Sequence, residues 1–433
     1  MMKMLIYGGR VIDPATNMDT ICDVYIEDGC IAEMGNNLSA KLTDADIQKI
    51  DATGKIVAPG LVDMHCHLRE PGQEYKEDIK SGTRAAAKGG FTSVACMPNT
   101  VPPIDNAALV TFVRSKAAET ASVNVFPIGA VSKGQKGEEL AEIGDMKDAG
   151  AVAISDDGKP VSSPVLMRRA LEYANMFNCL VISHCEDMSL VAEGSMNEGA
   201  VATRLGLKGI PCAAEEVQVA RDIIIAGEMG ARLHLAHLST AGSIEILRQA
   251  KAKGISVTAE TCPHYFTLTD EAVDGFDTNA KMNPPLRSAQ DVEAIIEGLA
   301  DGTIDAIATD HAPHHVDEKD VEFAAASNGI IGLETALSLG ITYLVKTNRI
   351  SLMKLIELMS KNPSDILGIG KGSIAKGQAA DLVVFDMETP YTVKAEDFAS
   401  KSKNSPYIGH TLYGKVAYTV VNGKPVVVNG ELV

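Results

Sequence analysis

The chain has 433 residues, of which 45% are hydrophobic, and a formal net charge of −18. This length and composition are enough for a large buried core. The acidic balance disfavours binding to nucleic acid or to an anionic membrane, so a small anionic substrate would need a local basic pocket.

No segment of the sequence is typical of export or membrane insertion. The N-terminal residues lack the apolar core of a signal peptide, and no apolar run reaches the ~18 residues of a membrane span. The eight cysteines contain no C-x-x-C pair and mostly lie in apolar runs, which predicts reduced core residues rather than disulfides. We therefore expect a cytoplasmic protein.

The two ends of the chain have a similar pattern. Residues 1–58 contain short apolar runs separated by turn pairs such as Gly8-Gly9 and Asp28-Gly29. Residues 370–433 repeat this pattern, with Asn422-Gly423 between two valine-rich runs. We expect both segments to form one composite β domain.

Residues 59–369 alternate between apolar strand candidates and helical stretches. Eight strand candidates are found, at 61–68, 91–97, 122–131, 150–155, 179–184, 231–237, 255–262 and 304–309. This α/β pattern predicts a (β/α)8 barrel of the TIM type. An open doubly wound sheet remains the alternative, although no G-x-G-x-x-G follows the first strand. The polar insertion at 313–329 is expected to be a mobile loop over the barrel mouth.

The end of the first strand carries the pattern H-x-H-x-R. Side chains in a strand alternate between faces, so His65, His67 and Arg69 are expected to project the same way. Two imidazoles can share a cation, and an arginine beside them can hold an anion. An isolated H-x-H is as often a hydrogen-bonded structural pair as a metal site. The residues at the other strand ends therefore decide whether this pair binds a metal.

Polar residues follow the other strands at the edge where barrel enzymes place their active sites. These residues are Asp157, His184, His237 and Asp310. Four histidines and two carboxylates suit Zn²⁺ and suffice for two ions, with Asp157 placed to bridge them. Asp310 is the candidate for a metal ligand that also transfers a proton during attack on a carbonyl, or alternatively for a helix N-cap.

Three nearby polar residues are expected to lie outside this cluster or at its margin. His234 and Asp156 have the opposite strand parity from His237 and Asp157, which predicts structural roles. His264 lies near the mouth, and its role stays open between support of the site and packing of the core.

Four motifs resemble one family. Residues 57–72, which end in His-Leu-Arg-Glu-Pro-Gly, are similar to the signature of the amidohydrolase superfamily and, within it, of the dihydroorotases. Residues 97–100, 281–287 and 308–314 resemble the same family in the same order. The resemblance implies a barrel with a small β-sandwich domain built from both termini. It also implies a zinc-dependent enzyme, a dihydroorotase, that reversibly interconverts N-carbamoyl-L-aspartate and L-dihydroorotate in de novo pyrimidine (UMP) biosynthesis.

The resemblance assigns roles to individual residues. His65, His67 and Asp310 would hold one zinc, His184 and His237 the other, and Asp157 would bridge, with Asp310 as the catalytic acid and base. The substrate carboxylate would be bound by Arg69, Asn99 and His314, and the ring amide by Asn283. Asn328 and Gly329 would add backbone contacts.

One departure from the wider superfamily bears on the number of metals. Many relatives use a carboxylated lysine as the bridge, whereas residues 153–158 contain no lysine inside the strand. This points to the aspartate-bridged branch of dihydroorotases, whose members bind one or two metals.

Two other functions stay open, together with the state of assembly. A hydantoinase or allantoinase would act on rings without the carboxylate that Arg69 would bind. A non-catalytic dihydroorotase-like partner of aspartate transcarbamoylase should have lost metal ligands, and all six are present. The resemblance also implies a homodimer and a possible association with an aspartate transcarbamoylase.

Overall fold

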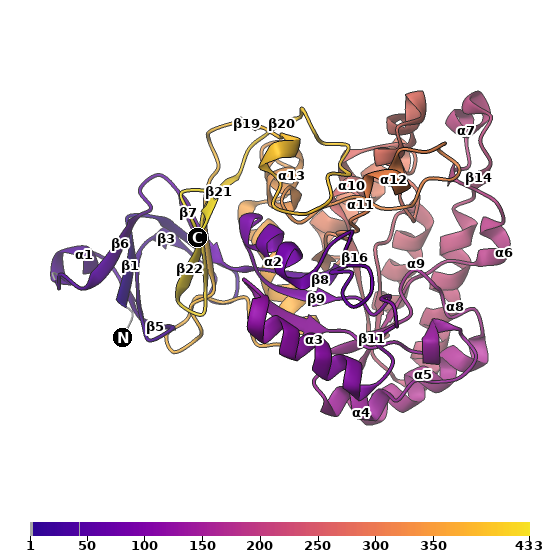
Figure 1. Ribbon diagram of the computed structural model, residues 1–433, viewed down its shortest axis with the longest axis horizontal. Coiled ribbons are helices and arrows are strands. Elements are labelled where there is room, and N and C mark those ends of the chain that lie inside the picture. The colour runs from indigo at the N-terminus through magenta and orange to yellow at the C-terminus, as the bar shows by residue number, and fades with distance from the viewer. Residues whose placement is uncertain (1–2, 43) are drawn as a thin grey trace.

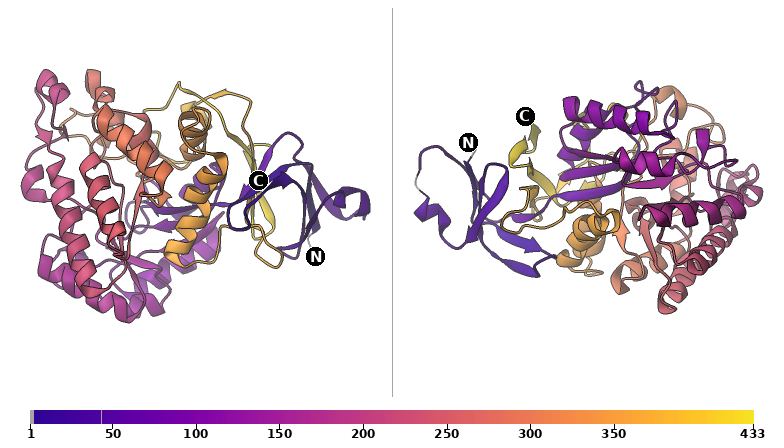
Figure 2. Two further views of the ribbon diagram at one scale, coloured as in Figure 1. Left: turned by 180° about the vertical axis from the view of Figure 1, so that it is seen from behind. Right: turned by 90° about the horizontal axis from the view of Figure 1, so that it is seen from below.

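The computed structural model describes residues 3–42 and 44–433 (Figure 1). A β region that contains both chain termini lies at one end of the molecule, beside a larger region in which helices surround parallel strands (Figures 1 and 2). Among the described residues, no helix is both long and apolar enough to cross a membrane.

The β region contains a sheet that combines strands from both ends of the sequence. β7 pairs with β18 in antiparallel register, with Val57 opposite Val384, and both side chains are fully buried. Seven strands form this sheet: β23 (Glu431–Leu432), β22 (Lys424–Val428), β21 (Lys415–Val421), β18 (Leu382–Asp386), β7 (Ile56–Pro59), β2 (Arg10–Asp13) and β3 (Met18–Ile21). Four more form a second sheet: β5 (Cys30–Gly35), β4 (Asp23–Glu27), β1 (Lys3–Tyr7) and β6 (Ile47–Asp51).

The sequence patterns missed β2 and β3. Each is four residues long, and β3 is an edge strand whose last three residues are exposed. An exposed edge strand such as β3 carries no alternation of apolar and polar residues, which removes the signal on which a strand prediction depends. β2 is largely buried, but its apolar run is only Val11-Ile12.

The larger region contains all eight predicted strands. They form two parallel sheets, β10-β9-β8 and β11-β12-β15-β16-β17, and bridges from Gly129 to Ile154 and from Cys66 to His311 lie where the two sheets meet. Every residue of β8 and β9 is buried, as expected for strands covered on both faces. The strands are β8 (Leu61–Cys66), β9 (Phe91–Cys96), β10 (Asn124–Pro127), β11 (Ala153–Ser155), β12 (Leu180–Ser183), β15 (Leu233–Leu235), β16 (Val257–Thr261) and β17 (Ala306–Ile307).

Local sequence signals set the ends of the connecting helices. The Asp78 side chain caps α2 by accepting from the Ser81 N–H, and Ser163 caps α5, in which Pro164 follows at the first position. Gly230 ends α8 in the left-handed conformation, with φ 59°. The main helices are α2 (Ile79–Lys88), α3 (Ala107–Thr120), α4 (Ile143–Asp148), α5 (Pro164–Met176), α8 (Ala213–Met229), α9 (Ala241–Ala252) and α11 (Ala289–Asp301).

Shorter helices and ladders complete the chain. The helices are α1 (Leu38–Lys41), α6 (Met188–Val191), α7 (Ala200–Leu205), α10 (Pro263–Thr267), α12 (Val316–Lys319), α13 (Ala336–Gly340), α14 (Leu352–Ile356) and α15 (Asn362–Leu367). Two small ladders pair β13 (Met196–Asn197) with β14 (Gly209–Ile210) and β19 (Tyr391–Thr392) with β20 (Thr411–Leu412).

The polar insertion at 313–329 is partly helical and is anchored by two buried lysines. It contains α12, and the Lys319 ammonium donates to the carbonyls of Ser327 at 2.8 Å and Gly329 at 3.0 Å. The Lys281 ammonium donates to those of Ala324 at 2.8 Å and Ala326 at 2.7 Å. These bonds fix the path of the segment beside the cavity described below, and its mobility stays a prediction.

Candidate metal centre and active site

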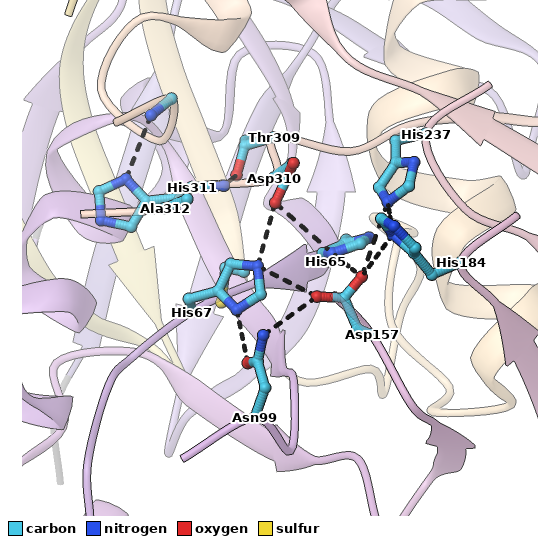
Figure 3. A network of polar contacts seen from close by, with 12 residues as sticks. His65, His67, Asn99, Asp157, His184, His237, Thr309, Asp310, His311 and Ala312 are labelled. Carbon is cyan, nitrogen blue, oxygen red and sulfur yellow. Dashed lines mark hydrogen bonds and ion pairs between the residues drawn. The ribbon is translucent and has the colours of Figure 1, made fainter. Parts of the chain in front are cut away.

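The predicted metal ligands come together at the C-terminal ends of the strands (Figure 3). His65 is the fifth residue of β8, and His67 follows just past its end. The Oδ1 of Asp310 lies 3.0 Å from the Nε2 of His67 and 3.6 Å from the Nε2 of His65. All three residues are buried.

Asp157 lies at the centre of this cluster, as Figure 3 shows. Its Oδ1 is 3.3 Å from the Nε2 of His65, 3.5 Å from the Nδ1 of His184 and 3.6 Å from the Nε2 of His237. Its Oδ2 is 3.5 Å from the Nε2 of His67. Burial disfavours the charged form of Asp157, but the charge of His65 and the neighbouring imidazoles of His184 and His237 hold its pKa well below the usual range. One carboxylate thus faces all four histidines.

The atoms of this cluster fit a bound cation. The Nε2 of His65 and the Oδ1 of Asp157 are buried, and neither has a hydrogen-bond partner in the described part of the chain. Buried polar atoms without partners are costly, so such a pair is typical of atoms that bind a ligand. Ligand atoms lie within 4.8 Å of one another in two groups, His65 with His67 and Asp310, and His65 with Asp157 and His237. Imidazole nitrogens and carboxylate oxygens in this number suit Zn²⁺.

We expect chelation of the bound metal to lower the melting temperature, because metal removal leaves buried charges and imidazoles without their ligand. Thermal unfolding before and after chelation, and after zinc is added back, measures the effect. The shift should vanish in His65→Ala and persist in His315→Ala, which changes a half-exposed histidine outside the cluster. Equal melting temperatures with and without chelator in the unaltered protein would contradict a metal site here.

Two buried glutamates behind the histidines were not predicted. The Oε1 of Glu260 lies 2.7 Å from the Nδ1 of His65, and its Oε2 lies 3.4 Å from the Nε2 of His234. Burial opposes the charged form of Glu260, but these two histidines lower its pKa to about 2. The Oε2 of Glu186 lies 3.0 Å from the Nε2 of His184. A carboxylate behind a histidine fixes which ring nitrogen faces the metal.

The cluster opens into a cavity of about 200 Å³. Every residue predicted to bind substrate lines it: Arg69, Asn99, Asn283, His314, Asn328 and Gly329. His67, Asp157, His184, His237 and Asp310 line the same cavity, so the substrate-binding candidates and the metal candidates face one space.

Arg69 is the basic group of this cavity. It is 8% exposed, and within the described ranges no carboxylate oxygen lies within 4.0 Å of its guanidinium. Its Nε donates to the carbonyl of Pro313 at 3.2 Å, and a terminal nitrogen lies 3.4 Å from the Nε2 of His314. Burial lowers the pKa of Arg69 below its usual value. A buried cation with no carboxylate in direct contact calls for an anionic ligand.

The side chains of Asn99 and His314 already contact neighbouring groups. The Oδ1 of Asn99 lies 2.8 Å from the Nδ1 of His67, and its Nδ2 donates to Asp157 at 3.3 Å. His314 lies 2.8 Å from the carbonyl oxygen of Asn328, and burial beside Arg69 lowers its pKa to about 3. Asn99 therefore also supports the metal candidates.

The backbone of Gly329 differs from expectation. Its N–H donates to the carbonyl of Lys281 at 3.0 Å, so this amide is not free for the predicted substrate contact as the structure stands. Its φ is +126°, and a Cβ at this position would come within 2.6 Å of the Ala312 Cβ. Glycine is therefore needed for the close approach of this segment to the cavity.

The residues placed outside the cluster by parity have structural contacts. Asp156 accepts from the N–H groups of Val131 at 2.8 Å and Ser132 at 3.1 Å. His234 is fully buried, and its Nδ1 lies 2.7 Å from the Thr258 hydroxyl. The sequence leaves the role of His264 open between support of the site and packing of the core. It is buried with its Nε2 lacking a partner among the described residues, and burial lowers its pKa to about 3.

Comparison with curated proteins decides the family. The chain is 58% identical over 426 residues to a dihydroorotase of Ruminiclostridium cellulolyticum, covering 98% of this chain and 99% of the relative. It is 59% identical over 424 residues to a dihydroorotase of Acetivibrio thermocellus, with the same coverage. The chain belongs to the dihydroorotase family. A family model described as dihydro-orotase-like also matches residues 54–243.

Solved structures place the fold of this dihydroorotase-family chain among related amidohydrolases. An L-hydantoinase (dihydropyrimidinase) from Arthrobacter aurescens superposes with a TM-score of 0.90 at 27% identity, covering 100% of this chain and 98% of the other. A D-hydantoinase from a Bacillus sp. AR9 gives a TM-score of 0.86 at 26% identity, covering 99% and 96%. The overall fold is thus shared with hydantoinases, whereas the sequence is far closer to dihydroorotases.

Proposed function

We propose that this chain is a dihydroorotase, which reversibly interconverts N-carbamoyl-L-aspartate and L-dihydroorotate in de novo pyrimidine synthesis. The observation that carries the proposal is the unpaired, buried Arg69, which faces the cluster of candidate metal ligands across one cavity. A cyclic amide that carries a carboxylate can bind Arg69 while its ring carbonyl reaches the cluster. Identity of 58–59% to named dihydroorotases supports the same substrate.

We propose two zinc ions, with one as the alternative, held by the six predicted residues. His65, His67 and Asp310 would hold one ion, His184 and His237 the other, and Asp157 would bridge. When bound, zinc polarises a carbonyl and lowers the pKa of a water molecule toward neutrality.

The chain's own residues then orient the ring and move one proton. Arg69, with Asn99 and His314 beside it, binds the carboxylate, and Asn283 binds the ring amide. In ring opening, Asp310 accepts the proton of the attacking water and passes it to the departing ring nitrogen. In ring closure, Asp310 removes a proton from the carbamoyl nitrogen as this atom attacks the side-chain carboxylate, which loses water. Asp310 lines the same cavity as Arg69 and Asn283, which supports its position for both steps.

A hydantoinase-like cyclic amidase is the second candidate, because the similar solved structures include hydantoinases. Hydantoins and allantoin carry no carboxylate that would match Arg69. A non-catalytic partner of a transcarbamoylase is disfavoured, since all six candidate ligands are present and lie together.

We expect the purified protein to contain zinc and to hydrolyse L-dihydroorotate in the same sample. Bound metal per chain and the rate of ring opening should fall together on chelation and recover together when zinc is restored. Metal-free protein with full activity would contradict the proposed metal chemistry, whereas zinc-loaded protein without activity would contradict the proposed substrate.

We propose further features of the whole chain and of its assembly. The eight parallel strands close into a (β/α)8 barrel over 59–369, and 1–58 with 370–433 form the composite β domain in the cytoplasmic enzyme. We also propose the homodimer that the family resemblance implies. Mass measurement of the native protein, alone and mixed with an aspartate transcarbamoylase, tests the dimer and that association.

A further inference from the structure

We propose that Glu186 is a positioning residue that joins a metal-binding histidine to the substrate-binding asparagine through one carboxylate oxygen. The inference rests on the proposed function and deepens it. The Oε2 of Glu186 lies 3.0 Å from the Nε2 of His184 and accepts from the Nδ2 of Asn283 at 2.9 Å. One oxygen thus holds a group from each half of the active site.

The place of Glu186 in the fold makes this link rigid. The residue follows His184 by two positions, just past the end of β12. Its side chain is 9% exposed, so little water competes for the two hydrogen bonds. The carbonyl of His184 is also held, since it accepts from the Gln218 side chain at 3.2 Å.

The first consequence concerns the ring nitrogens of His184. An ionised carboxylate can only accept a hydrogen bond, so the Nε2 of His184 carries the proton. The Nδ1 is then left with its lone pair, and it faces the Oδ1 of Asp157 at 3.5 Å and the Nε2 of His237 at 2.8 Å. Glu186 thereby presents His184 in the form that binds a metal.

The second consequence concerns the amide of Asn283. The carboxylate of Glu186 fixes the NH₂ end of this amide, because a carboxylate cannot donate. No hydrogen bond between described side chains or backbone groups uses the Oδ1 of Asn283, and the residue lines the cavity. Asn283 therefore offers an acceptor, which selects a ligand with a ring N–H at this point rather than a ring carbonyl.

Glu260 provides a matched comparison on the other side of the cluster. Its side chain is 1% exposed and lies 2.7 Å from the Nδ1 of His65. Its other oxygen faces His234, which does not line the cavity. Both glutamates support a metal-binding histidine, and of the two only Glu186 also contacts a candidate substrate residue.

The test compares Glu186→Gln with Glu260→Gln, and with Glu228→Gln as a control at an exposed position of α8. Zinc affinity is measured by titrating metal-free protein, and KM and kcat for L-dihydroorotate are measured at saturating zinc. Both buried variants should bind zinc about 10–100-fold more weakly. Glu186→Gln alone should also raise KM, by about tenfold, because a neutral amide oxygen accepts from Asn283 more weakly than a carboxylate oxygen and no longer fixes the orientation of the Asn283 amide.

Asn283→Ala tests the link from the substrate side. It should raise KM, and the double variant with Glu186→Gln should raise KM no further, since both changes remove one interaction. It should also weaken zinc binding severalfold, because Glu186 loses the partner that holds its oxygen. If Glu186→Gln does not fold, the KM and zinc affinity of Asn283→Ala alone test the link between Glu186 and Asn283.

Three results would overturn the proposal. The first is an unchanged KM in Glu186→Gln at saturating zinc. The second is the same change in zinc affinity and in KM in Glu186→Gln and Glu260→Gln. The third is a KM in the double variant that rises by the product of the two single-variant factors. Each would leave the proposed function intact if the unaltered enzyme hydrolyses dihydroorotate. An unaltered, zinc-loaded enzyme without this activity would instead refute the proposed function.

Discussion

Asp310→Asn is expected to lower kcat for L-dihydroorotate by about 10²–10⁴-fold while zinc stays bound. Asparagine keeps an oxygen beside His67, where Asp310 now lies 3.0 Å away, but it cannot accept and return a proton. Turnover in both directions should fall together, because the same group acts as base in one direction and as acid in the other.

The fall in kcat should depend on the carboxylate of Asp310 and not on other carboxylates near it in the sequence. Asp317→Asn, which changes a side chain 85% exposed in the same segment of the chain, should keep normal turnover. Rates are measured in variants whose bound zinc has been counted. A zinc-loaded Asp310→Asn enzyme within severalfold of normal kcat would remove Asp310 from the proton transfer.

Arg69→Met is expected to lower kcat/KM for L-dihydroorotate by about 30- to 4,000-fold. Loss of a buried charge-assisted pair costs about 2–5 kcal/mol, and each 1.4 kcal/mol is a factor of about ten. The effect should appear chiefly in KM if Arg69 binds the carboxylate equally in the ground and transition states.

Two controls separate carboxylate binding from general damage. Arg168→Met, which changes an exposed arginine on α5, should leave kcat/KM unchanged. Zinc content of Arg69→Met should also be normal, because the guanidinium contacts Pro313 and His314 and no candidate metal ligand. An Arg69→Met enzyme with normal kcat/KM would place the carboxylate elsewhere.

The strand ends could be predicted from the sequence because the relevant signals are local. Apolar runs that end in His65, His184 or Asp310 mark both the strand and its functional end, and the parity of Asp156 against Asp157 separated a turn residue from a cluster residue. The eight strands were found for the same reason, although β10 and β17 are shorter than their apolar runs.

What could not be predicted depends on contacts between distant parts of the chain. The bond between Glu186 and Asn283 joins residues 97 positions apart, and that between Glu260 and His65 joins residues 195 apart. Glu186 does carry one local signal, since it follows His184 at the spacing by which His67 follows His65. The buried Lys319 that anchors the segment 313–329 lies in a charged run that reads as solvent-exposed.

A comparison of two ring substrates tests most directly the claim that the chain is a dihydroorotase. The kcat/KM of the zinc-loaded protein for L-dihydroorotate is divided by its kcat/KM for hydantoin, which has a similar cyclic amide and no carboxylate. A buried, unpaired Arg69 beside the metal candidates predicts a ratio far above one. A ratio below one would mean that the cavity is that of a hydantoinase-like cyclic amidase and would contradict the proposed function.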